Sequence, residues 1–235
     1  MDQISDLKSS SINFFEIFLW IKSVILAEII FGFFLVYVFL IDFSVSLKSI
    51  GSAIAASASI MIGLSFALSG ICYFFDFLDR EFYYRKYFGL VGYFLALFYS
   101  VLLLFIDPQR YFYGFFDNLL SLDVILGLSA MTIFTMMAII SNKTAMILLK
   151  PQNWRALLRL GYLAYGLLVI RAAVLEKDLW LAWWKQHNSL PPVRLVISVF
   201  AVMVILLRIS IKISKLIKMA TRQPISPKPI ANNKI

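Results

Sequence analysis

Residues that could carry chemistry are scarce in this chain, and their spacing forms no catalytic set. The sequence holds one histidine, His187, and one cysteine, Cys72. A single thiol can form neither an internal disulfide nor a cysteine-based zinc or iron–sulfur site. The hydroxyls of Ser129, Thr132 and Thr135 lie beside no histidine or carboxylate that would activate a nucleophile, and no glycine-rich phosphate loop is present. The sequence therefore predicts no catalytic residue and no metal site.

Two ionisable residues stand out within the apolar stretches, where a charge is costly. Glu28 falls in the first third of Leu19–Ile41, and Arg171 in the second half of Leu157–Leu175. In one interpretation they form a buried ion pair or hold a charged ligand, because a long arginine side chain partly closes a depth difference of about 5–10 Å. In the other, Arg171 extends outward to Glu176 or to lipid headgroups, while Glu28 is protonated or faces a small cavity.

The elements that must position these residues are membrane helices. Hydrophobic residues make up 61% of the 235 residues and charged residues 15%, with a mean hydropathy of +0.86. This composition excludes a soluble enzyme, a disordered chain and a nucleic-acid-binding module. A membrane-spanning helix needs about 20 mainly apolar residues. The sequence predicts an all-α bundle of six transmembrane helices, at Leu19–Ile41, Ser52–Phe75, Tyr87–Ile106, Leu119–Ile140, Leu157–Leu175 and Val193–Ile213.

Basic residues predict the orientation of this bundle. If both termini share one side, that side holds 15 lysines and arginines and the other side holds 5, with Lys22 and Arg171 inside spans. The positive-inside rule then places both termini in the cytoplasm. We expect a cytoplasmic segment over residues 1–18, the bundle over 19–221 and a disordered basic, proline-containing tail over 222–235. The expected location is the cell membrane, with the bacterial inner membrane favoured, and the lipid bilayer is the expected surrounding.

The second span is rich in small residues, from Gly51 to Gly70. Such a surface lets a neighbouring helix approach closely. This packing interpretation is favoured, although the surface could also leave room for a flat ligand.

Two stretches resemble a known family. The first runs from Ser141 to Ile209 and reads S-N-K-T-A-M, then W-R-A-L-L-R-L-G-Y-L-A-Y from Trp154, then Arg171. The second is Arg85–Leu90, R-K-Y-F-G-L. They resemble the ferric reductase-like transmembrane domain, nearest the haem-binding membrane subunit of the bacterial methionine sulfoxide reductase system. The resemblance covers most of the chain from about residue 50 and implies six spans with both ends cytoplasmic.

In that family, histidines on the third and fifth spans hold b-type haem. The corresponding positions in this chain are Tyr99, Leu158 and Arg171. Leucine cannot bind iron, arginine stays protonated, and tyrosine is an axial ligand in some haem proteins. The resemblance therefore implies the fold together with the loss of bis-histidine haem ligation. No cofactor is expected, although a quinone or an atypical haem b stays open.

The sequence favours one function and leaves two others open. The favoured one is a haem-free subunit that binds a protein partner or a lipid-like or quinone-like ligand, without enzymatic activity of its own. The alternative is an oxidoreductase that transfers electrons across the membrane with atypically bound haem, flavin or quinone. A transporter is disfavoured, because all seven prolines fall outside the spans and no internal repeat is found.

Overall fold

The computed structural model describes residues 2–74, 83–186 and 190–221, and these residues form helices and short connections without a strand. His187 and the tail from Arg222 lie outside the described residues. In chain order the helices are α1 (Asp2–Asp42), α2 (Leu47–Phe74), α3 (Tyr84–Ile106), the π-helical turn η2 (Gln109–Tyr113), α4 (Phe115–Asn118), α5 (Leu122–Ile140), α6 (Lys143–Leu148), α7 (Pro151–Gln186) and α8 (Val193–Thr221).

Six of these helices, α1, α2, α3, α5, α7 and α8, are long and apolar enough to cross a membrane. This confirms the predicted six spans and is compatible with an integral, multi-pass membrane protein. The helices differ from the predicted spans mainly in length. Helix α1 begins at Asp2 and so includes residues 2–18, and α7 runs eleven residues past Leu175, to Gln186. Helix α7 has a kink at Glu176, whose backbone leaves the helical region (φ −131°, ψ 15°).

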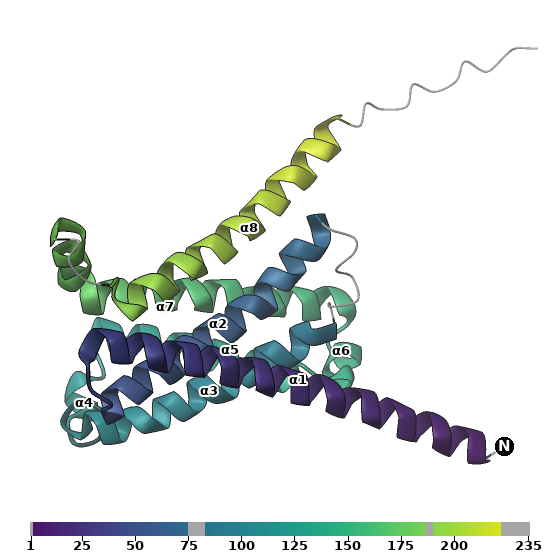
Figure 1. Ribbon diagram of the computed structural model, residues 1–235. Helices are drawn as coiled ribbons and strands as arrows, with labels where there is room; N and C mark the ends of the chain where they lie inside the picture. The colour runs from purple at the N-terminus through teal and green to yellow at the C-terminus, as the bar shows by residue number, and fades with distance from the viewer. Residues whose placement is uncertain (1, 75–82, 187–189, 222–235) are drawn as a thin grey trace, which may run out of the picture.

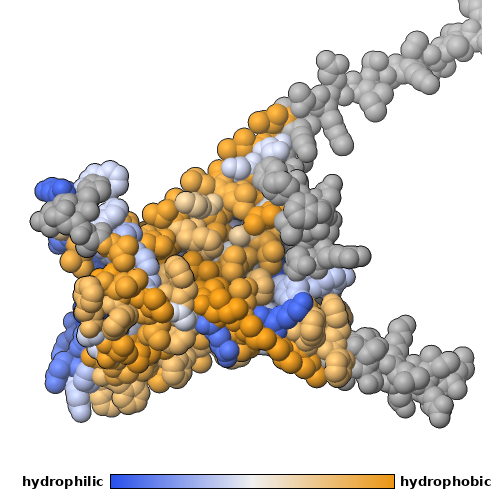
Figure 2. All heavy atoms as spheres, viewed as in Figure 1, coloured by the Kyte–Doolittle hydropathy of each residue, from blue (hydrophilic) through white to orange (hydrophobic). Residues whose placement is uncertain are grey.

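The helix ends gather at two opposite ends of the bundle (Figure 1). The α1–α2 connection, η2, α4 and the kinked part of α7 lie at one end, and the start of α1, α6 and the end of α8 lie at the other. The first and last described residues therefore share one end, as an even number of spans requires. Figure 2 shows hydrophobic residues over most of the visible face of the bundle, with hydrophilic residues mainly toward its ends.

Helix α2 forms the core of the bundle. Its most apolar stretch is 67% buried, whereas no other span exceeds 22%. Helices α1, α3 and α8 pack on it, and Ala53, Ala56 and Ser57 have no exposed surface. Helix α3 approaches closest at Gly92, where a Cβ would lie 2.9 Å from the backbone nitrogen of Ile62. These contacts are those that the packing interpretation of the small residues predicts.

The connection between α5 and α7 shows why these helices begin and end where they do. Asn142 caps α6 by accepting a hydrogen bond from the backbone N–H of Ala145, at 2.6 Å. Lys150 reverses the chain with a positive φ of 61°, and Pro151, which needs no N–H partner, opens α7. Trp154 then donates its indole N–H to the carbonyl of Ile140 at 2.9 Å and joins the start of α7 to the end of α5.

Candidate functional site

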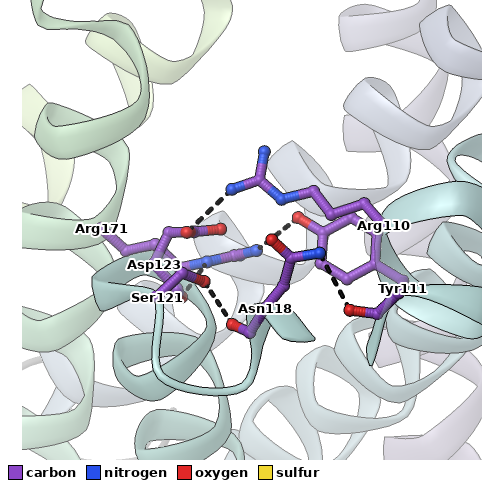
Figure 3. Close-up of polar contacts among 7 residues, drawn as sticks. Arg110, Tyr111, Asn118, Ser121, Asp123 and Arg171 are labelled. Carbon is purple, nitrogen blue, oxygen red and sulfur yellow. Dashed lines mark hydrogen bonds and ion pairs between the residues drawn. The ribbon is translucent and has the colours of Figure 1, made fainter. Parts of the chain in front are cut away.

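The strongest polar cluster surrounds Arg171, a predicted site residue on α7 (Figure 3). Its side chain crosses to α5 over Gly127, where a Cβ would lie 3.1 Å from the arginine Nε. The Nε donates to the backbone carbonyl of Asp123 at 3.0 Å, and Nη2 donates a long bond of 3.5 Å to the Tyr111 hydroxyl. Arg171 therefore joins α7 to the first turn of α5 and to η2.

Asp123 is the second part of the cluster. Its carboxylate is 6% exposed and accepts a hydrogen bond from Arg110 Nη2 at 2.8 Å. Arg110 Nε and Asp123 Oδ2 are buried without another partner. Both atoms belong to this same ion pair, so a small rotation of the guanidinium would give the two-bond geometry common in arginine–carboxylate pairs. A carboxylate in the first turn of α5 also interacts favourably with the helix dipole.

The connection between α3 and α5 is held by bonds within itself, also drawn in Figure 3. Asn118 donates its side-chain amide to the carbonyl of Gly114 at 2.9 Å, and Ser121 donates its hydroxyl to the carbonyl of Asn118 at 2.6 Å. Arg110 donates its backbone N–H to the Asp107 carboxylate at 3.3 Å. The cluster of Arg110, Asp123 and Arg171, named here the outer clamp, thus rests on an ordered turn.

The outer clamp differs from both interpretations drawn from the sequence. Arg171 makes its bonds to Asp123 and Tyr111, whereas Glu176 pairs with Arg194 of α8 at 2.8 Å. Sequence reasoning missed Asp123 altogether and counted Arg110 as a charge of the outer loop. A signal was present: Asp123 opens an apolar run, at a position where an acidic residue favours a helix start.

The other two positions expected to replace haem histidines lie elsewhere. The ring of Tyr99 packs at the start of α2, where a Cβ on Gly51 would lie 3.6 Å from its Cε2 atom. Leu158 is half-buried on α7, thirteen residues and about 20 Å along the helix from Arg171. Tyr99 thus contacts α2, whereas Arg171 contacts α5. The side chains of these two residues therefore face different helices.

Aromatic side chains fill the space between α2 and α7. Tyr165 has no exposed surface and donates its hydroxyl to the carbonyl of Ser59 at 2.9 Å. Phe66 stacks on Tyr162 with ring centroids 4.6 Å apart, and Tyr162 donates to the Phe66 carbonyl at 3.3 Å. A Cβ on Gly63 would lie 2.5 Å from the Tyr165 hydroxyl, so this glycine makes room for the ring.

Glu28, the remaining predicted residue, is exposed on the outside of α1. It does not meet Arg171, whose described contacts are to α5 and η2. Arg110 pairs with Asp123 and Arg194 pairs with Glu176, and neither of these ion pairs includes Glu28. The first span therefore presents a carboxyl group at the lipid-facing surface of this single chain.

The arrangement holds helices together and shows no constellation for bond-making chemistry. Among the described residues, the histidine, cysteine, aspartate and glutamate side chains form no group of three or more that could hold a metal ion. Comparison of the sequence with models of known protein families finds no match, and a search of curated proteins finds no significant match. The class defined by the fold is a multi-pass helical membrane protein.

Proposed function

We propose that this chain is a haem-free relative of the ferric reductase-like transmembrane domain and serves as a partner-binding subunit of a membrane complex. The observation that carries the proposal is the aromatic filling between α2 and α7. Tyr165 and Phe66 are 0% and 4% exposed, and Tyr165 is hydrogen-bonded across the gap to Ser59. Side chains packed to this degree leave a flat macrocycle no room between α2 and α7 unless the core rearranges.

The residues at the three expected haem positions support the same proposal. Arg171 is a rigid part of the outer clamp, and Tyr99 packs at the start of α2. Neither leucine nor an arginine held as a cation offers a lone pair to iron. Because its own side chains occupy the space between α2 and α7, we place the binding of a protein partner on the outer surface of the bundle.

The test is the absorbance spectrum of the full chain, purified in mild detergent from cells supplied with haem precursor. We expect no Soret band and no redox-dependent change in the visible region. A histidine-ligated haem protein of the same family, purified in parallel, is the positive control. A Soret band in stoichiometric amount would overturn the proposal and favour transmembrane electron transfer.

A further inference from the structure

The outward position of Glu28 on α1 points to a specific binding face. Glu28 lies six residues beyond Lys22, which is about 9 Å along the helix axis. Lys22 lies level with the start of the α3 span, because its ammonium is 6.0 Å from the ring centre of Tyr84, the first residue of α3, and Glu28 is midway along the candidate span Phe14–Asp42. Glu28 is therefore well inside the hydrocarbon layer.

A carboxyl group at this depth needs a partner. Ionised side chains inside a bilayer are costly, and they usually pair with one another or face a water-filled cavity. Glu28 faces outward, and in the described part of the chain no side chain forms an ion pair or hydrogen bond with it. Even a protonated carboxyl group keeps a donor and acceptors that lipid tails cannot satisfy, so another molecule is needed to supply the missing hydrogen bonds.

The surface next to Glu28 suits a transmembrane helix. Val24 and Gly32 lie one turn before and after Glu28, on the same side of α1. Val24 is 41% exposed, and a Cβ on Gly32 would meet no atom within 4 Å. Small and short side chains on either side of a polar residue are typical of helix–helix contacts in membranes.

We infer that the α1 face formed by Val24, Glu28 and Gly32 binds a transmembrane helix of a second membrane protein that carries a lysine or arginine at the depth of Glu28. This inference rests on the proposed partner-binding function and names the chemistry of the partner. A second copy of this chain fits less well, because a two-fold axis along the membrane normal would place two Glu28 carboxyl groups opposite each other. A basic side chain supplies the opposite charge and the missing hydrogen bonds.

The probe is a dye-labelled polyleucine helix with one central lysine, mixed with labelled full-length protein in phosphatidylcholine vesicles. Energy transfer between the dyes measures association. We expect the lysine peptide to bind about fivefold to thirtyfold more tightly than the same peptide with a central leucine. The preference should vanish in Glu28→Gln. It should persist in Glu16→Gln, which removes a carboxylate from α1 on the other side of Lys22.

Reversing the charge of residue 28 provides a second part of the same binding experiment. Glu28→Lys should lose affinity for the lysine peptide and gain affinity for a peptide with a central glutamate. Equal binding of the lysine and leucine peptides, or a preference that survives Glu28→Gln, would overturn the inference. Self-association that depends on Glu28 would also overturn it and assign the face to a second copy. A haem spectrum would instead defeat the proposed function, so the two failures are distinguishable.

Discussion

Arg171 reaches its partner only because residue 127 has no side chain. The arginine Nε lies 3.1 Å, and the Cζ 3.3 Å, from the position that a Cβ on Gly127 would occupy. The arginine therefore lies flat across α5 and donates to a carbonyl one turn away, at Asp123. A charge that looks isolated within the fifth span is in this way connected to the first turn of the fourth span, α5.

Enlarging Gly127 should separate these helices. Gly127→Val is expected to lower the free energy of unfolding by about 1–3 kcal/mol, because the added methyl groups displace the guanidinium. Gly127→Ala should change the free energy of unfolding by less than about 1 kcal/mol, since the better helix propensity of alanine offsets the close contact of its Cβ with Arg171. Denaturing-detergent titration of the purified protein measures both. Gly166→Ala, at a position with no atom within 4 Å of a Cβ, is the control and should not lose stability. A fully stable Gly127→Val variant would contradict the close approach.

Removing both partners of the Arg110–Asp123 pair should cost less than the sum of the two single removals. Asp123→Asn and Arg110→Met are each expected to destabilise the protein by about 1–3 kcal/mol. The first leaves the partly exposed Arg110 guanidinium, and the second the buried Asp123 carboxylate, without its charge partner. The double variant should lose less unfolding free energy than the two single variants lose together, and the difference, the coupling energy, should be about 0.5–3 kcal/mol. Asp117→Asn changes an exposed neighbouring carboxylate and serves as the control. Strict additivity would show that the ion pair contributes nothing.

Substitutions of Tyr165 test whether the space between α2 and α7 is tightly packed. Tyr165→Phe is expected to cost about 1 kcal/mol, because the carbonyl of Ser59 loses its donor. Tyr165→Ala should cost about 3–5 kcal/mol through the cavity it leaves between α2 and α7. Tyr113→Phe, on a ring that is 72% exposed, should leave the unfolding free energy unchanged. If Tyr165→Ala were as stable as the native protein, the centre would not be tightly packed.

Much of the fold could be predicted from local composition. Each span is a long apolar run, and in a bilayer the backbone must satisfy its own hydrogen bonds, so such runs become helices without reference to their neighbours. The abundance of small residues in the second span likewise indicated close packing. The ends were less predictable, because α1 and α7 continue as helices beyond their apolar cores.

The sequence by itself determined the class, the number of spans and the absence of histidine at the three expected haem positions, since each of these depends on residue types along one segment. The partners of the charges were decided by tertiary structure. Asp123 lies 48 residues from Arg171, and their contact depends on how α5 and α7 pack. The outward direction of Glu28 was equally hidden, because α1 is apolar on all sides and its sequence carries no periodicity that marks the buried face.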